Sequence, residues 1–383
     1  MYKITHINSS AGIGGGETHL LLLARYLHGN GFHLDFVLPE EGTFCDRLHA
    51  AGLTYQVVPM TSKFQPNARR RLRQLLERNA PDLVHCHGAR ANWFGRTAAR
   101  QAGVRTVFST VHNSLKDYPY PGWLRRLYVM MEKRTAFLVS QWIAVSQSIK
   151  SDLVEYYGLP PGRIEVIPNG VDLRDFQPAA RRSDVLRELS LPAEVNLLIA
   201  AGRMTEQKGH RYLLAAIARI YSDFPDLHCV LAGDGPLRGT LENEARRLGI
   251  RERVHFVGFR SDVPDLVAAA DLYVLSSISE GMPIGLLEAM ALRCAVVASA
   301  VNGVTEVVRH RIDGLLVPPS DPDSLSQAIR ELLTDLSLRR RLAEAGRERV
   351  AQDFTAEKMA FRVADLYRAR LAETRLTPSA PGI

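Results

Sequence analysis

Short apolar segments alternate with longer amphipathic ones along nearly the whole chain, and this alternation restricts the fold more than any other feature. Short apolar runs are typical of buried strands, and apolar side chains at a spacing of three or four are typical of helices. Such an alternation builds a parallel sheet covered by helices. In the first half, strands are expected at 3–8, 34–38, 54–59, 83–87, 105–111, 141–145 and 164–167. Helices are expected over 17–30 and 90–102, followed by glycines placed to end them, Gly31 and Gly103.

The second half repeats this rhythm. Its strands are expected at 196–201, 227–232, 254–259, 272–276, 295–299 and 315–317, before a helical tail over 322–374. Between the halves, residues 168–185 (PNGVDLRDFQPAARRSDV) combine proline, glycine and charge, so they are the expected linker. We therefore predict an α/β fold of two facing Rossmann-like domains, each a doubly wound parallel sheet, with a cleft between them. The predicted domains are 1–175 and 176–360, followed by a C-terminal helix and tail, 361–383, that can pack back on the first domain.

Length and composition agree with two globular domains, because 383 residues are many for one. The chain is 46% hydrophobic and 23% charged, and it contains no run of 18 apolar residues, so no membrane-spanning helix is expected. The first residues, MYKITHINSS, lack the basic head and apolar core of a signal peptide. A reduced, cytoplasmic protein with buried thiols is expected, because no CxxC motif occurs among the four cysteines, Cys45, Cys86, Cys229 and Cys294.

The net charge of +7 is unevenly distributed. Residues 1–180 carry 21 Lys and Arg against 14 Asp and Glu, whereas residues 181–383 carry 27 of each kind. A basic half suggests an anionic partner, which can be nucleic acid, a phospholipid surface or a phosphorylated substrate. A solvated face that serves solubility explains the same charge.

Two glutamates flank a glycine-rich turn in the segment SEGMPIGLLEAMA, residues 279–291. Pro283 and Gly285 predict a helix that begins around 283–285, with Glu280 on the loop before it and Glu288 in its first turn. A helix N-terminus binds anions through its unpaired N–H groups, and carboxylates accept hydrogen bonds from sugar hydroxyls. The turn therefore suits a ligand with both phosphate and sugar groups. A helix start with two incidental glutamates is the alternative.

Three further loops follow strands in the second half. Residues 202–209 (GRMTEQKG) place Arg203 and Lys208 after the strand NLLIAA, where two cations can hold a diphosphate from two sides. The next strands end in AGDGP at 232–236 and in GFRSD at 258–262. Each loop alone can be an ordinary solvated turn. Four consecutive strand ends with such loops predict a ligand site.

These motifs, in this order, resemble those of the retaining glycosyltransferases of the GT-B fold, specifically family four (glycosyltransferase group 1). The resemblance covers nearly the whole chain and includes IPNGVD at 167–172. It implies sugar transfer from a nucleotide-diphosphate sugar to a saccharide or lipid-linked acceptor, with retention at the anomeric carbon. The pathway it implies is cell-surface glycan synthesis, such as that of polysaccharide or lipopolysaccharide. The donor is then a co-substrate, and neither a metal nor another cofactor is expected.

The resemblance also implies roles for individual residues. Glu280 contacts the donor sugar, Glu288 contacts the nucleotide ribose, and Lys208 neutralises the diphosphate together with Arg203. The catalytic set that it implies is His112, Arg203, Lys208 and Glu280. The donor-binding set that it implies is Gly15, Gly16, Gly202, Arg203, Lys208, Gly233, Asp234, Gly258, Phe259, Arg260, Glu280, Gly281, Met282, Pro283, Ile284, Gly285, Leu286 and Glu288. The stretch GMPIGLLEAM departs from the phenylalanine–glycine pair of many members, so the donor sugar does not follow from this motif.

The first half is expected to hold the acceptor. Its first loop, SSAGIGGGETH, lacks the last glycine of the G-x-G-x-x-G fingerprint, because Glu17 stands at that place. Gly15, Gly16 and Glu17 match the corresponding family turn loosely, and this helix start could face the diphosphate. The acceptor-side residues are predicted to be Glu17, His87 and Asn113. His112, at the end of the strand RTVFSTV, is expected near the donor sugar or is a structural histidine.

The tripeptide HCH at 85–87 consists of residue types that commonly bind metal ions. In a strand, His85 and His87 share one face while Cys86 points to the other, so the three cannot converge on one ion. No second cluster in the sequence completes a tetrahedral site. We therefore expect no metal there, and Arg203 with Lys208 offers a metal-free way to stabilise the leaving group.

Other classes explain less of the sequence. A nucleotide-sugar-binding protein or an epimerase-like GT-B protein without acceptor transfer is the alternative, whereas a phosphorylase needs a lysine that carries pyridoxal phosphate, and none is evident. A nucleic-acid binder leaves the donor-side loops unused. Residues 67–79 (NARRRLRQLLERN) predict a helix capped by Asn67, with a stripe of Leu72, Leu75 and Leu76 among arginines. This helix either docks on an anionic inner membrane face or packs its leucines on the sheet.

Overall fold

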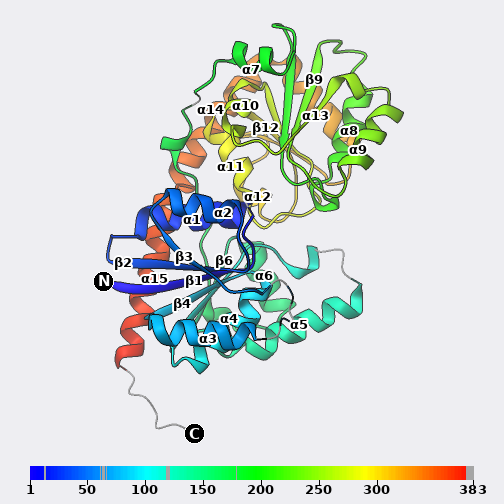
Figure 1. Cartoon of the computed structure of the whole chain (residues 1–383). Helices are drawn as coiled ribbons and strands as arrows, with labels where there is room; N and C mark the ends of the chain where they lie inside the picture. The colour runs from blue at the N-terminus through cyan, green and yellow to red at the C-terminus, as the bar shows by residue number, and fades with distance from the viewer. Residues whose placement is uncertain are drawn as a thin grey trace. The chain divides into compact units, whose positions relative to one another are not determined.

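The computed structural model describes residues 1–12, 14–60, 62, 65, 67–117, 121–177 and 179–376. Internal contacts divide the chain into two compact units, and each is described by itself. Unit 1 consists of Met1–Asn169 and Ala356–Ile383, and unit 2 of Gly170–Thr355 (Figure 1). The chain therefore leaves unit 1, completes unit 2 and returns to unit 1 with its last helix.

The expected boundaries after residues 175 and 360 each lie five or six residues beyond the structural ones. The reason is a local pairing of the two segments that cross between the units. Val171 and Thr355 form a parallel bridge, and the Val171 N–H donates to the Phe354 carbonyl at 2.9 Å. Both crossing segments are thus fastened to unit 2 close to where they enter and leave it.

Unit 1 is built on a seven-stranded parallel sheet with the order β3-β2-β1-β4-β5-β6-β7. The strands are β1 Tyr2–Asn8, β2 Phe32–Leu38, β3 Thr54–Val57, β4 Leu83–His87, β5 Thr106–Val111, β6 Gln141–Ala144 and β7 Ile164–Val166. From β1, the chain first builds outward through β2 and β3. It then returns to the other side of β1 with β4, so the winding reverses between β1 and β4.

Helices cover both faces of this sheet (Figure 1). They are α1 Gly15–Leu27, α2 Thr43–Ala50, α3 Ala68–Asn79, α4 Ala89–Gln101, η1 Leu115–Asp117, α5 Gly122–Ala136, α6 Gln147–Glu155, η2 Pro161–Arg163 and α15 Ala356–Leu376. One apolar cluster joins Leu20 of α1, Phe44 of α2 and Tyr367 of α15. A second cluster lies on the opposite face, between the sheet and α3 and α4. The last helix of the chain is therefore part of the core of the first unit.

The helix expected over 67–79 is present as α3, but its leucines do not face a bilayer. Leu72, Leu75 and Leu76 are at most 5% exposed and belong to the core cluster on the sheet. The capping prediction is also wrong, because Asn67 adopts a left-handed conformation with φ 62° and its side chain makes no cap hydrogen bond. The apolar stripe is thus an ordinary core face. The arginines at 69–71 and 73 lie on the exposed side of the helix.

Unit 2 repeats the architecture with a six-stranded parallel sheet of order β10-β9-β8-β11-β12-β13. Its strands are β8 Asn196–Ala201, β9 Leu227–Ala232, β10 Val254–Gly258, β11 Leu272–Leu275, β12 Ala295–Ser299 and β13 Leu315–Val317. The predicted α/β class, with two doubly wound parallel sheets, is confirmed. Four of these six strands match their expected bounds at both ends, because each is a compact apolar run.

The remaining elements of unit 2 are η3 Leu173–Asp175, α7 Arg182–Glu188, η4 Glu206–Lys208, α8 His210–Ile220, α9 Arg238–Arg247, η5 Arg251–Arg253, α10 Val263–Ala269, α11 Ile284–Ala291, α12 Val304–Val307, α13 Pro322–Thr334 and α14 Leu336–Asp353. The expected helical tail consists of α13, α14 and α15. Asp321 and Asp335 cap the first two of these helices through their carboxylates. The four cysteines are buried free thiols, as expected. Among the described helices, none combines the length and apolar composition needed to cross a bilayer.

Candidate active site

The sheet of unit 2 reverses its winding between β8 and β11. From β8 the chain proceeds outward through β9 and β10, then returns to the other side of β8 with β11. In doubly wound sheets, the loops at the carboxyl ends of the strands separate at this reversal and leave a ligand crevice. Loops 202–209 and 276–283 follow β8 and β11, so they border the place where the topology predicts a ligand.

Backbone hydrogen bonds join the loops on one side of this place. The Gly202 N–H donates to the Ala232 carbonyl at 2.9 Å, and the Gly233 N–H donates to the Gly258 carbonyl at 2.7 Å. Gly233 has φ +144°, and a Cβ there would lie 2.0 Å from the Gly202 carbonyl oxygen, so the approach requires glycine. The loops after β8, β9 and β10 thus form one continuous rim.

An ion pair between Lys208 and Glu280 spans the reversal. The Lys208 ammonium nitrogen lies 2.6 Å from Glu280 Oε1, and the Ser277 hydroxyl donates to the same oxygen at 2.6 Å. The Lys208 side chain is 24% exposed and that of Glu280 only 7%. The ammonium group is therefore accessible to a ligand from solvent, while the carboxylate is fixed by two charge-assisted hydrogen bonds.

Residues that the sequence analysis missed hold the Glu280 loop in place. The Gln207 side-chain amide donates to the Ser279 carbonyl at 3.1 Å, and the Asn302 side-chain amide lies 3.3 Å from the Ser279 hydroxyl. The Gly303 N–H donates to the Glu280 carbonyl at 3.3 Å, and a Cβ on Gly303 would lie 1.8 Å from the Gly281 carbonyl oxygen. The asparagine–glycine pair after the fifth strand, in SAVNGVTE, was the available signal.

Helix α11 begins at Ile284, within the expected range, and Pro283 precedes it as the N-cap residue. The prediction that Glu288 lies in the first turn is wrong, because Glu288 is the fifth helical residue. Gly285 lies in the first turn, where a Cβ would come within 2.9 Å of the Tyr273 hydroxyl. This glycine lets α11 approach β11 closely, so the first amides of α11 follow directly on the loop that carries Glu280.

Three other predicted donor-binding side chains, those of Arg203, Arg260 and Phe259, take no part in the Lys208–Glu280 ion pair. Arg203 is exposed and, within the described residues, has no ion-pair partner. Arg260 is instead held by Glu188 at 2.6 Å and by Asp262 at 2.5 Å, and this contact lowers the pKa of the Asp262 carboxyl. Phe259 is 61% exposed, so its ring is open to stacking by a planar ligand.

A neutral histidine lies beside the Lys208 ammonium group. His210 opens α8 and is 4% exposed. Burial, with a smaller contribution from the Lys208 charge, lowers the pKa of His210 to about 4. At neutral pH, the positive charge of this loop therefore belongs to Lys208 and Arg203 and not to the histidine.

In unit 1, the predicted acceptor-side residues gather at the reversal between β1 and β4. The Asn8 amide donates to Glu17 Oε1 at 2.9 Å, and Glu17 is 8% exposed. The rings of His87 and His112 stack with centroids 5.8 Å apart, and the His112 ring lies 3.9 Å from the Cβ position of Gly16. Gly16, Glu17, His87 and His112 are therefore close to one another, while Asn113 follows His112 in sequence.

Five histidine rings form a cluster inside unit 1, built from β1, α1, β4 and the end of β5: His6, His19, His85, His87 and His112. Burial lowers the pKa of His6 to about 3, of His19 to about 4 and of His112 to about 3. It also holds the pKa values of His85 and His87 well below the ordinary range. All five rings are consequently neutral at physiological pH.

Three of these histidines bear on the metal question. His85 and His87 share one face of β4, as expected, with ring centroids 4.1 Å apart. The structure adds a histidine that the sequence did not indicate, because one ring nitrogen of each of His6, His85 and His87 lies within 4.8 Å of the others. His85 Nδ1 lies 2.6 Å from the Tyr367 hydroxyl, and its Nε2 lies 2.8 Å from the Thr110 hydroxyl. Because both nitrogens of His85 have partners, the trio is better suited to a hydrogen-bonded core network than to a metal.

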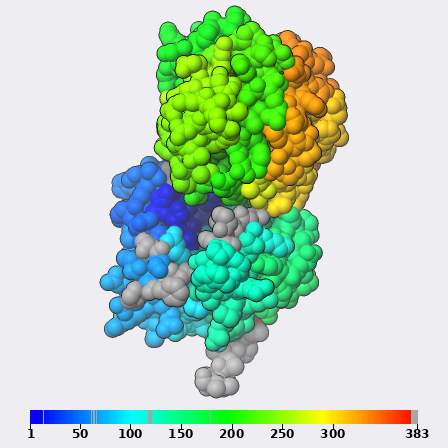
Figure 2. Space-filling model, turned by 90° about the vertical axis from the view of Figure 1, so that its right-hand side faces the viewer, coloured from blue at the N-terminus to red at the C-terminus, as the bar shows by residue number. Residues whose placement is uncertain are grey.

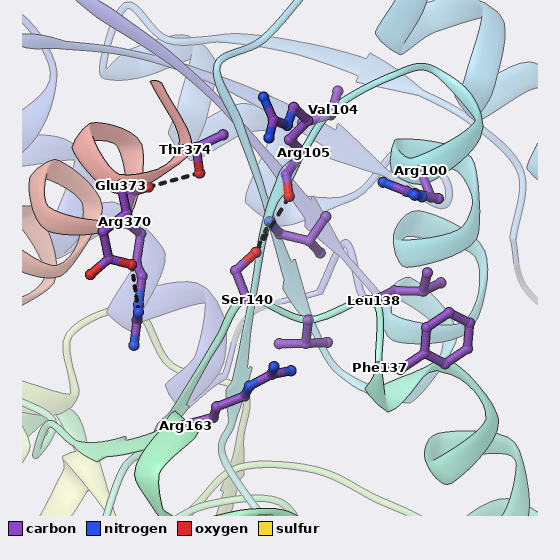
Figure 3. A pocket seen from close by; sticks show the side chains of 12 residues that line it. Arg100, Val104, Arg105, Phe137, Leu138, Ser140, Arg163, Arg370, Glu373 and Thr374 are labelled. Atoms are coloured by element: carbon purple, nitrogen blue, oxygen red, sulfur yellow. Dashed lines mark hydrogen bonds and ion pairs between the residues drawn. The ribbon is translucent and has the colours of Figure 1, made fainter. Parts of the chain in front are cut away.

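A basic hollow of about 420 Å³ lies at the amino ends of β5, β6 and β7, away from the winding reversal of unit 1. Figure 3 shows its arginines, which come from α4, the residue before β5, η2 and α15: Arg100, Arg105, Arg163 and Arg370. Glu373 pairs with Arg370 at 2.7 Å. The hollow lies at the amino ends of the strands, whereas Glu17 and His87 lie at the carboxyl ends. It is therefore separate from the candidate site.

Two doubly wound parallel sheets, with ligand loops at the reversal of the second, define the GT-B class of fold. The solved structure of HepE from Anabaena in complex with UDP-glucose is similar in fold, with a TM-score of 0.86 and 24% sequence identity over 96% of this chain and all of that one. The profile described as "Glycosyl transferases group 1" matches residues 182–349, and that described as "Glycosyltransferase Family 4" matches residues 13–175. The chain belongs to this glycosyltransferase family.

Two relatives support the assignment. The putative glycosyltransferase EpsD of Bacillus subtilis is 31% identical over 319 residues, which cover 78% of this chain and 80% of EpsD. The UDP-Gal:alpha-D-GlcNAc-diphosphoundecaprenol alpha-1,3-galactosyltransferase of Escherichia coli is 28% identical over 373 residues, which cover 95% of this chain and 96% of that enzyme. The protein is therefore a glycosyltransferase, as its motifs indicated.

Proposed function

We propose that this glycosyltransferase moves a sugar, with retention of its anomeric configuration, from a nucleotide-diphosphate sugar to a saccharide or lipid-linked acceptor. The observation that carries the proposal is the Lys208–Glu280 pair at the winding reversal of unit 2, directly before the first amides of α11. A cation, a fixed carboxylate and a helix start at one place suit a ligand that joins phosphates to a sugar. Retention rests on the family to which the chain belongs.

In this proposal the donor diphosphate meets the Lys208 ammonium group and the N-terminus of α11, with Arg203 able to reach it from the same loop. These groups stabilise the negative charge that develops as the sugar–phosphate bond breaks. Glu280, already oriented by Ser277, accepts hydrogen bonds from hydroxyls of the donor sugar. Glu288, one turn further along α11, contacts the ribose, and Phe259 stacks on the base. Three sets of roles in unit 1 remain predictions: donor binding for Gly15 and Gly16, catalysis for His112, and acceptor contact for Glu17, His87 and Asn113.

The reaction is proposed to need no metal ion, because Arg203 and Lys208 supply the positive charge that a metal supplies in other transferases. We expect an excess of EDTA to leave turnover nearly unchanged. Initial rates should be measured on protein pre-treated with chelator, with and without added Mg²⁺ or Mn²⁺. A loss of activity with EDTA that either ion restores would contradict this prediction.

The acceptor is proposed to be lipid-linked or saccharide, in cell-surface glycan synthesis at the inner face of the cytoplasmic membrane. The Escherichia coli relative, whose acceptor is a diphosphoundecaprenol-linked sugar, supports this assignment. The test is a panel of nucleotide sugars, first screened for slow hydrolysis and then offered with lipid-linked and free saccharides. The anomeric configuration of the product, read by NMR, decides retention. Donor binding without hydrolysis or transfer to any acceptor would instead favour a nucleotide-sugar-binding protein.

A further inference from the structure

One face of helix α5 in unit 1 exposes large apolar side chains to solvent. Trp123 and Met130 of α5 are 70% and 52% exposed, and Phe137, the C-cap residue that continues the helical backbone by one position, is 75% exposed. They are seven residues apart, so they form a line about 21 Å long on one side of the helix. Figure 2 shows the cyan-green segment that contains α5 at the surface of unit 1. Single exposed apolar residues are common, but a line of three on one helix indicates an interaction surface.

Basic residues lie between these apolar ones. Arg126 and Lys133 are exposed and fall three residues after Trp123 and Met130, respectively. The face therefore reads apolar, basic, apolar, basic, apolar at spacings of three, four, three and four, which is one side of a helix. Arg134 adds a further exposed cation beside Lys133. Every apolar side chain of the face thus has a cation next to it.

The opposite face of α5 is fixed to the body of unit 1. Met131 and Thr135 are buried. Glu132, the one carboxylate of α5, lies 2.8 Å from the fully buried Arg96 of α4 and is itself only 12% exposed. The sole negative charge of the helix therefore points inward, and the outward face is uniformly positive.

A hollow of about 450 Å³ opens beside this face, between α5 and α6. It is lined by Arg126, Val129, Met130, Lys133, Arg134 and Tyr156. Three cations and the apolar side chains of Val129 and Met130 in one lining match a phosphate-bearing head group joined to a hydrocarbon chain. At the end of the line, Phe137 also lines the arginine hollow of Figure 3, so the positive surface continues beyond the helix.

We propose that the outward face of α5 docks unit 1 on an anionic phospholipid bilayer. Trp123, Met130 and Phe137 enter the boundary between head groups and acyl chains, and Arg126, Lys133 and Arg134 bind the head-group phosphates. Protein–protein interfaces gather their apolar residues in a core that is poor in lysine, whereas here cations separate the apolar side chains. The inference rests on the proposed function only in taking the acceptor to be lipid-linked.

This assignment replaces α3 as the docking element. The arginines of α3 are exposed, but its leucines are in the core. Helix α3 can therefore attract an anionic bilayer by its charge, but it has no exposed apolar side chains to insert. Helix α5 offers both. The two helices therefore provide matched variants. Two exposed cations can be replaced on either helix, but two exposed apolar side chains can be replaced only on α5.

Co-sedimentation with vesicles tests the proposal on the full chain, without donor or acceptor. Wild-type protein is expected to bind vesicles that contain phosphatidylglycerol, and to bind pure phosphatidylcholine vesicles weakly. The double variant Trp123→Gln/Phe137→Gln should weaken binding about tenfold or more. Its matched control is Ile312→Gln/Leu336→Gln in unit 2, which removes two apolar side chains that are 52% and 47% exposed and should leave binding unchanged.

The charged residues give a second comparison. Arg126→Gln/Lys133→Gln should weaken binding by about fivefold for each residue replaced, at low salt. Arg69→Gln/Arg70→Gln on α3 should cost clearly less. Trp123 emission should shift to the blue on addition of anionic vesicles, and Trp123→Phe should abolish the shift, because Trp142 is only 2% exposed and Trp93 packs against the core.

Three results would overturn the proposal: equal binding to both kinds of vesicle, wild-type binding by Trp123→Gln/Phe137→Gln, or a loss from the α3 pair as large as from the α5 pair. Turnover of each variant with a soluble acceptor is measured in parallel. Failure of vesicle binding with transfer intact contradicts docking alone. Docking without any transfer contradicts the proposed function alone.

Discussion

Replacement of Lys208 by alanine is expected to lower turnover by about two to three orders of magnitude while unit 2 remains folded. The ammonium group lies at the winding reversal of the sheet, 24% exposed and 2.6 Å from Glu280. In the proposed reaction it faces the diphosphate as negative charge develops on it. Loss of one aimed donor to such a charge costs about 3–4 kcal/mol in the transition state. Turnover should be measured at saturating donor, so that weaker donor binding does not imitate loss of catalysis.

Two variants make this result specific. Arg211→Ala removes a neighbouring cation on α8, which is 53% exposed and lies 3.7 Å from Glu206, so it should retain near wild-type turnover. Glu280→Gln keeps the shape of the side chain but removes its charge. Alone, it should lower activity. Combined with Lys208→Ala, it should not restore the activity that the lysine variant has lost. A folded Lys208→Ala protein with wild-type turnover would remove this loop from the proposed site.

Unit 1 is expected to lose stability steeply as the pH falls from 6.5 to 5. Burial depresses the pKa values of His6, His19 and His112 to between about 3 and 4. Below pH 6.5 the unfolded chain binds protons on these rings and the folded chain does not. Each ring therefore costs about 1.4 kcal/mol per pH unit, or about 2 kcal/mol by pH 5. The penalty is absent above pH 6.5 and reaches its full size only below the folded pKa values.

Hydrogen exchange read by mass spectrometry measures this effect in unit 1 alone. Amides of β1 and β4 should lose protection between pH 6.5 and 5, after correction for the intrinsic pH dependence of exchange. His112→Gln should make the decline shallower by about 1.4 kcal/mol per pH unit. The exposed His49 provides the control, because His49→Gln should leave the slope unchanged. Identical slopes in all three proteins would show that the cluster does not set the acid sensitivity.

Strand positions and the class of fold followed well from the sequence because parallel strands buried on both faces are short apolar runs with sharp ends. The segments 196–201 and 227–232 are examples, since each coincides with a strand of unit 2. The positions of two loops directly after apolar runs also placed Lys208 and Glu280 beyond strand ends. Their 2.6 Å contact depends on the strand order, which puts β8 beside β11 although two strands lie between them in the sequence.

Contacts that depend on tertiary packing could not be foreseen. Ser277 and Asn302 are ordinary loop residues until the fold brings them to Glu280 and Ser279. Helices α3 and α5 show the same difficulty for surfaces. A leucine stripe among arginines in α3 fits a bilayer or a core equally well, and only the packing against the sheet decides between them. In α5 the hydrophobic residues occur all round the helix, so the exposed line is visible only once the buried side is known.

The return of the chain to unit 1 affects the order in which the protein can fold on the ribosome. Residues 170–355 form a continuous unit, so they can fold as soon as they emerge. The core of unit 1 also includes Met359, Val363 and Tyr367 of α15, which are synthesised after unit 2. Until α15 has emerged, the face of the first sheet that it covers remains exposed, and the apolar side chains of that face are available to chaperones. Synthesis of unit 1 thus begins before that of unit 2, and unit 1 is completed after it.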